Sequence, residues 1–100
     1  MAACVRLLNA RGADTWHFNV SGSNGETGLP DRMIVTRGVA IALETKSAVG
    51  RVRPKQAWQH DRARMAGAVV CVARCADDLA RMLDAIDLES DQAGRGKKAA

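Results

Sequence analysis

The chain has 100 residues, of which 47% are hydrophobic and 26% charged, so it has the size and composition of one small globular domain. No apolar stretch is as long as a membrane span, and the N-terminus lacks the pattern of a secretory signal peptide. The three cysteines include no Cys-x-x-Cys pair, which excludes a zinc-finger framework, and we expect a cytoplasmic protein with reduced thiols and no membrane contact. The net charge of +4 is compatible with a polyanionic partner but does not identify one.

The first half of the chain predicts one helix followed by three strands. We expect the helix in residues 1–10 and the strands in residues 15–20, 32–36 and 39–46, with a Gly- and Ser-rich loop at residues 21–28. The last two strands are separated by Arg37-Gly38, a plausible two-residue turn because Gly adopts positive φ easily. This segment therefore predicts a β-hairpin.

The second half predicts a helix, a buried strand and a second helix. Pro54 suits the first turn of a helix, and Gly67 suits its end. The apolar run 68–73 is typical of a strand covered on both faces, and residues 76–88 have apolar side chains at helical spacing. The result is an α/β fold, a small mixed β-sheet flanked by helices in the order α-β-β-β-α-β-α, with parallel pairing of the strands at 39–46 and 68–73. Residues 1–88 form the domain, and residues 89–100 form a polar, disordered tail.

Asp31, Glu44 and Lys46 form the candidate site. Because strand side chains alternate between faces, Glu44 and Lys46 project from the same side. An ideal hairpin register pairs Asp31 with Glu44, with Cβ atoms about 5 Å apart. Two carboxylates this close repel unless a cation such as Mg²⁺ lies between them, and Lys46 could then orient a water or neutralise a phosphoryl oxygen. The simpler alternative is a solvent-exposed ion pair beside an ordinary turn.

A basic stretch follows the candidate site. Its members are Arg51, Arg53, Lys55, Arg62 and Arg64. They could contact DNA phosphates, or they could form the solvated face of a helix. In the same region we expect Trp58 to pack in the core and His60, like His17, to have a structural or solvated role.

Pro30-Asp31, followed after a hairpin by Glu44-Thr45-Lys46 in a strand, resembles the PD-(D/E)XK nuclease superfamily. A longer match, from about Gly28 to Leu83, is similar to the VRR-Nuc family, the virus-type replication-repair nucleases. The residues that carry it are Gly28, Pro30-Asp31, Val35, Gly38, Glu44, Lys46, Gly50-Arg51, Arg53-Pro54, Gln56, Trp58, Ala66-Gly67 and Asp77-Asp78-Leu79.

The resemblance implies a PD-(D/E)XK nuclease-like core and Mg²⁺- or Mn²⁺-dependent hydrolysis of DNA phosphodiesters. It makes Asp31 and Glu44 metal ligands, assisted by the Thr45 carbonyl. Lys46 becomes the catalytic lysine and Gln56 a further active-site residue. Minimal relatives are similar to phage proteins that act as homodimers on branched DNA such as Holliday junctions. The resemblance therefore implies an endonuclease of this type, in a phage-infected or prophage-bearing bacterial cell.

Two other functions stay open. Family members often carry an acidic residue on the first helix, and residues 1–9 contain none. This favours, as an alternative, a nonenzymatic nucleic-acid-binding module on the same fold. A small interaction protein without a DNA partner is the third possibility.

Overall fold

The computed structural model describes residues 1–20 and 27–99, with side chains described through residue 92. Most of the loop expected at residues 21–28 lies outside this part of the chain. The helices are α1 (Ala2–Ala10), α2 (Pro54–Met65) and α3 (Ala76–Ala99), and a short 3-10 turn, η1 (Gly12–Asp14), follows α1. The strands are β1 (Thr15–Asn19), β2 (Arg32–Thr36), β3 (Val39–Thr45) and β4 (Val69–Ala73). These elements confirm the predicted order, and η1 is the one described element that the sequence did not predict.

The four strands form one mixed sheet in the order β1-β2-β3-β4. The first two pairings are antiparallel and β3 pairs with β4 in parallel, as expected for strands joined by a helical connection. The β2–β3 hairpin turns at Arg37-Gly38, where φ is 53° and 77°. The two-residue turn pairs Thr36 with Val39 and Arg32 with Leu43, which is the predicted register.

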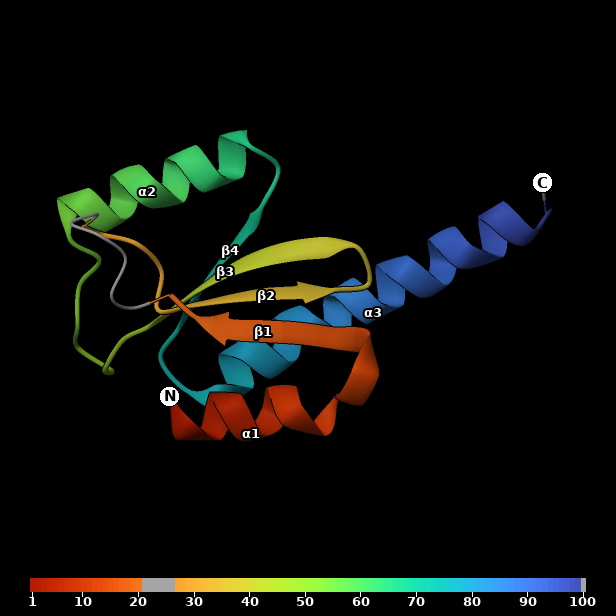
Figure 1. Cartoon of the computed structure of the whole chain (residues 1–100), viewed down its shortest axis with the longest axis horizontal. Helices are drawn as coiled ribbons and strands as arrows, with labels where there is room; N and C mark the ends of the chain where they lie inside the picture. Colours follow the sequence, from red (N-terminus) through yellow and green to blue (C-terminus); the bar gives the residue numbers. More distant parts are fainter. Residues whose placement is uncertain (21–26, 100) are drawn as a thin grey trace.

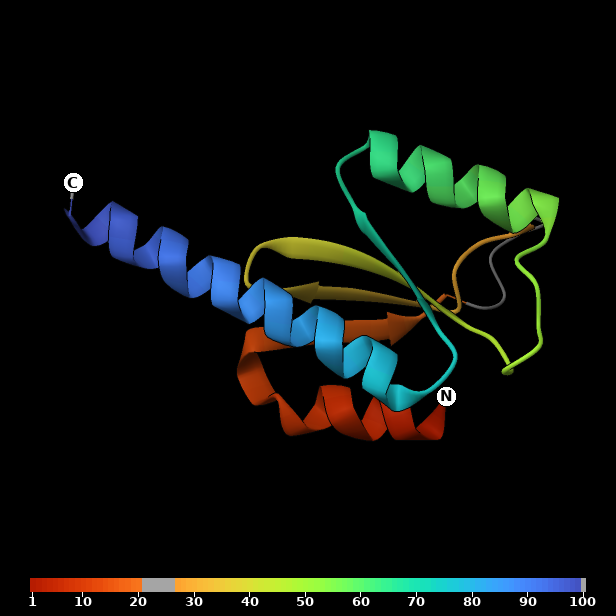
Figure 2. The same cartoon turned by 180° about the vertical axis from the view of Figure 1, so that it is seen from behind.

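Helices cover both faces of the sheet. Figures 1 and 2 show α1 and α3 side by side on one face and α2 above the other, where α2 contacts β4. The hydrophobic core lies under α1 and α3, and its members are Cys4, Leu8, Ile34, Ile41, Leu43, Cys71, Ala73, Leu79, Leu83 and Ile86. The α2 face of β3 carries Ala42 and Glu44, which are also buried. The predicted alternation of β3 is therefore correct, and both of its faces are covered.

A network of hydrogen bonds and one ion pair joins the helices to the sheet at the end where β2 meets the hairpin turn. The guanidinium group of Arg11 donates to both carboxylate oxygens of Asp87 on α3, at 2.7 and 3.0 Å. It also donates to the hydroxyl groups of Thr15 and Thr36, at 3.0 and 3.2 Å. One side chain thus joins the end of α1 to β1, β2 and α3.

The last helix does not end at Leu88, as the sequence analysis expected, because α3 continues to Ala99. Its second half lacks proline and contains several good helix formers, so the helix propagates past the part that packs on the sheet. Figure 1 shows α3 extending beyond the sheet. The division into a domain at 1–88 and a tail at 89–100 stays a prediction. Among the helices of residues 1–20 and 27–99, none has the length and apolar character needed to span a membrane.

Candidate active site

The hairpin register brings Asp31 and Glu44 together at one end of the sheet. Arg32 pairs with Leu43, so the next position along each strand places Asp31 opposite Glu44, as predicted. Asp31 is fixed by Thr45, whose backbone N–H and hydroxyl group both donate to Oδ2, at 2.8 and 2.9 Å. The carbonyl oxygen of Asp31 accepts a hydrogen bond of 3.2 Å from the N–H of Val20. Asp31 is thus held by both neighbouring strands before any ligand arrives.

Glu44 is a carboxyl group in a nearly closed environment. It is only 2% exposed. Burial, a hydrogen bond with Asp31 and the negative charge of Asp31 raise the pKa of Glu44 to about 7, although the nearby Lys46 lowers it. Burial acts in the same direction on Asp31, but hydrogen bonds from Thr45 and Glu44 outweigh it and keep the pKa of Asp31 below its usual value. Near neutral pH and without a cation, the pair therefore holds a proton on Glu44.

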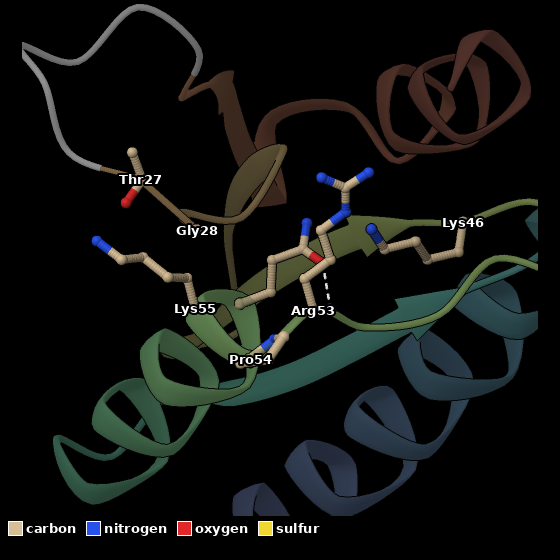
Figure 3. Close-up of a pocket in the computed structure, with 7 residues that line it drawn as sticks. Thr27, Gly28, Lys46, Arg53, Pro54 and Lys55 are labelled. Carbon is tan, nitrogen blue, oxygen red and sulfur yellow. Dashed lines mark hydrogen bonds between the residues drawn. The ribbon is translucent and has the colours of Figure 1, made fainter.

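Lys46 follows the last residue of β3, and its side chain lines a pocket. The pocket is lined by Thr27, Gly28, Lys46, Arg53, Pro54, Lys55 and Gln56. Figure 3 shows the side chains of Lys46, Arg53 and Lys55 around this space. Its volume of about 750 Å³ lies in the range of ligand sites. Three cationic side chains and no carboxylate in its lining make the pocket suitable for an anion such as a phosphate group.

The N-terminus of α2 forms one wall of this pocket. The side-chain carbonyl of Gln56 accepts a hydrogen bond of 3.0 Å from the backbone N–H of Arg53, which caps the first turn. Gly28 has φ of +76°, and a Cβ atom there would lie 2.6 Å from the carbonyl carbon and oxygen of Lys55. The chain entering β2 and the start of α2 therefore touch through backbone atoms, which requires glycine at position 28.

Comparisons with known proteins agree with this geometry. No family model and no curated protein matches the sequence. A solved structure described as "VRR_NUC domain" is similar, with a TM-score of 0.70 and 25% sequence identity over 83% of this chain and 88% of that chain. The chain has the fold of a VRR-Nuc domain. The resemblance and the fold class predicted from the sequence are thus confirmed, and the protein is a nuclease-type domain.

The helix α2 brings one histidine to the carboxylate pair. His60, on α2, is buried, and its Nε2 atom lies 3.9 Å from Oε1 of Glu44. Burial, with the positive charges of Arg64 and Lys46, lowers the pKa of His60, against the effect of Asp61. Sequence reasoning did not place His60 in the site. The available signal was its spacing of four residues from Gln56, which puts both on one face of α2.

The other histidine of the chain lies on the opposite face of the sheet. His17 pairs with Ile34 on β2, so its side chain is on the α1 side. Its Nε2 atom lies 2.8 Å from the side-chain oxygen of Asn9, and its Nδ1 atom accepts a hydrogen bond of 2.9 Å from Arg32. Burial and the charge of Arg32 lower the pKa of His17. These contacts give His17 a structural role between α1 and the sheet.

The basic residues divide into two groups. Arg53 and Lys55 line the pocket with Lys46, and Arg51 is exposed shortly before them. Arg62 and Arg64 lie at the other end of α2, where Arg64 pairs with Asp61 at 3.2 Å. Trp58 is 59% exposed, with Arg62 over its ring at 5.7 Å. The expectation that Trp58 packs in the core is therefore wrong, because α2 buries His60 and leaves Trp58 on its outer side.

The donor atoms of the candidate site suit a hard divalent cation. Mg²⁺ binds one or two carboxylates and completes its shell with waters and phosphate oxygens. Asp31 and Glu44 supply two carboxylates, and a cation would favour the ionised form of Glu44 against the burial and the negative charge of Asp31 that raise its pKa. Within residues 1–20 and 27–99 there is no group of three or more His, Cys, Asp or Glu side chains able to hold a metal ion. The donor set thus fits a cation held partly by water and substrate.

Proposed function

We propose that this VRR-Nuc domain is a divalent-metal-dependent deoxyribonuclease that hydrolyses phosphodiester bonds in DNA. The observation that carries the proposal is the position of the Asp31–Glu44 pair beside Lys46 at a pocket lined by cations. Carboxylates, a lysine and an anion-binding pocket are the parts that phosphodiester hydrolysis needs: cation ligands, a group that stabilises negative charge, and a seat for the phosphate.

The residues have separate roles in this proposal. Asp31 and Glu44 hold Mg²⁺ or Mn²⁺, with the Thr45 carbonyl as a further ligand, and the cation supplies Lewis-acid activation when it is bound. Lys46 stabilises the charge that develops on the phosphate. Gln56 orients the first turn of α2, and through it Arg53 and Lys55, around the phosphate. Arg51, Arg62 and Arg64 extend the contact along the DNA backbone, which makes binding dependent on salt.

We further propose that the enzyme is an endonuclease of phage type that acts as a homodimer on branched DNA such as Holliday junctions. The resemblance stated above supports this substrate. The edge strand β1 supports the dimer, because Trp16 is 67% and Phe18 40% exposed and their rings lie 5.0 Å apart. Exposed aromatic side chains on an edge strand are typical of a surface that another chain covers.

Lys46→Ala tests the enzymatic function. We expect metal-dependent cleavage to be lost in this variant, while DNA affinity changes little because Arg53 and Lys55 remain. The measurement is cleavage of labelled single-strand, duplex, nicked, flapped and four-way-junction DNA in Mg²⁺, Mn²⁺ or EDTA. Arg6→Ala is the matched control, because Arg6 is an exposed cation on α1, across the sheet from the site. Equal turnover by Lys46→Ala and wild type would remove Lys46 from the mechanism, and binding without cleavage of any DNA would favour the nonenzymatic module.

A further inference from the structure

Two buried polar atoms lack hydrogen-bond partners in the part of the chain whose side chains are described. They are Oε1 of Glu44 and Nε2 of His60. The two side chains are 2% and 4% exposed, and the atoms face each other at 3.9 Å. An unpaired buried polar atom destabilises the folded state, and native structures contain few of them. Two such atoms at one place therefore indicate a site whose partners are present only in its working state.

Packing does not account for a histidine at this position. His60 is the buried residue of α2, and the remainder of this helix has a weak apolar stripe. An apolar side chain of similar size would fill the same space without burying an unpaired nitrogen. The helix instead places a hydrogen-bond donor over a carboxylate of the candidate metal site.

The position of Glu44 shows what this donor can do. Asp31 acts on its carboxyl group and raises its pKa, and its Oε1 atom faces Nε2 of His60 without a partner. One carboxyl group thus connects Asp31 of the candidate site with His60 on α2. The 3.9 Å separation is too long for a direct hydrogen bond, and a small movement of either side chain would close it.

We propose that His60 is a positioning residue of the metal site, whose Nε2–H holds Oε1 of Glu44 and thereby fixes this carboxylate for binding the divalent cation together with Asp31. Carboxylates that bind metals are commonly oriented by such hydrogen bonds, and their loss typically lowers metal affinity 10- to 100-fold. Among the described residues, His60 does not form a three-ligand metal group with Asp31 and Glu44, so we place its role at Glu44 and not on the cation. This inference rests on the proposed function, because it assumes that Asp31 and Glu44 take a cation.

Substitutions at position 60 test the role. His60→Leu removes the donor and keeps an apolar side chain of similar size. His60→Gln keeps an amide N–H at about the reach of Nε2. Asp61→Asn, at the next position, is exposed and serves as the control. The main readout is Mn²⁺ affinity by isothermal titration calorimetry without DNA, and the second is thermal unfolding in EDTA.

We expect His60→Leu to bind Mn²⁺ about 10- to 100-fold more weakly than wild type. His60→Gln should recover most of the lost affinity, and Asp61→Asn should equal wild type. In EDTA, His60→Leu should unfold at the wild-type temperature or higher, because it removes an unpaired buried nitrogen. Lower metal affinity without lower stability is a combination that a merely structural histidine would not give. If His60→Leu does not fold, His60→Asn replaces it, since its amide is too short to reach Glu44.

Wild-type Mn²⁺ affinity in His60→Leu would overturn the role of His60, and so would equal weakening by Leu and Gln. Both results leave the proposed nuclease function intact. A wild-type protein that neither binds Mn²⁺ nor cleaves DNA would overturn the nuclease function together with this inference.

Discussion

Glu44 makes the stability of the metal-free protein depend on pH. In the folded protein, burial and Asp31 raise the pKa of Glu44 from its usual 4.5 to about 7. As the pH rises from about 4.5 to about 7, the unfolded chain ionises this group while the folded protein keeps it protonated. The free energy of unfolding therefore falls across this interval and stays lower above it. At about 1.4 kcal/mol per pKa unit, the loss is about 3 kcal/mol.

Glu44→Gln isolates this contribution. The glutamine amide can donate to Asp31 as protonated Glu44 does, but it does not ionise. We expect the variant to exceed wild type in stability by about 3 kcal/mol near pH 8 and to equal it near pH 4.5. The pKa of Asp31 is lowered in the folded protein. This group therefore stabilises the fold at pH values above its usual pKa of 3.8, and the stabilisation is lost as the pH falls below that value. His60, whose pKa is also lowered, costs stability as the pH falls below its usual 6.5. Asp31 is ionised over the whole interval from about pH 5 to about pH 8 in both proteins, and the causes of the His60 shift do not include Glu44, so the pH dependence of the difference comes from Glu44.

Urea denaturation in EDTA, from about pH 5 to about pH 8, measures the difference. Glu89→Gln on the exposed surface of α3 is the matched control, and its stability should follow wild type at every pH. A difference between Glu44→Gln and wild type that is constant over this range would refute the reasoning, since it would mean that Glu44 ionises alike in the folded and unfolded states.

Two further predictions concern the loop contact and the dimer. Gly28→Ala should cost more than about 2 kcal/mol in urea denaturation, because it combines positive φ with a 2.6 Å approach to Lys55. Gly12→Ala, with similar φ and open space around the added Cβ, should cost only about 1 kcal/mol; equal costs would contradict the contact. In sedimentation equilibrium the protein should have about twice its chain mass of 10.7 kDa, and replacing Trp16 and Phe18 by Ser should give monomers, whereas Trp58→Ser should not. A wild-type monomer at micromolar concentration would contradict the dimer.

The carboxylate pair could be predicted from the sequence because its geometry is local. A two-residue turn and strict alternation fix the register of a hairpin, and the register alone places Asp31 opposite Glu44. The parallel pairing of β3 with β4 follows similarly from the helix between them. Each of these predictions depends on residues that are close in the chain.

The role of His60 and the exposure of Trp58 could not be predicted in this way. Both depend on the angle at which α2 lies over β3 and β4, which no pattern within α2 determines. A weak apolar stripe shows that a helix buries little, but it does not show which side chain fills the interface. The contact of Arg11 with Asp87 joins positions 76 residues apart and leaves no periodic signal.

The Arg11 network lies at the opposite end of the strands from Asp31 and Glu44. Thr15 begins β1 and Thr36 ends β2, whereas Asp31 precedes β2 and Thr45 ends β3. The features that tie the helices to the sheet and the groups that bear the chemistry are thus separated by the length of a strand. Stability gained around Arg11 can therefore offset stability lost around Asp31 and Glu44. Mutations that strengthen the end of the sheet around Arg11 would allow the end around Asp31 and Glu44 to change its substrate without loss of the fold.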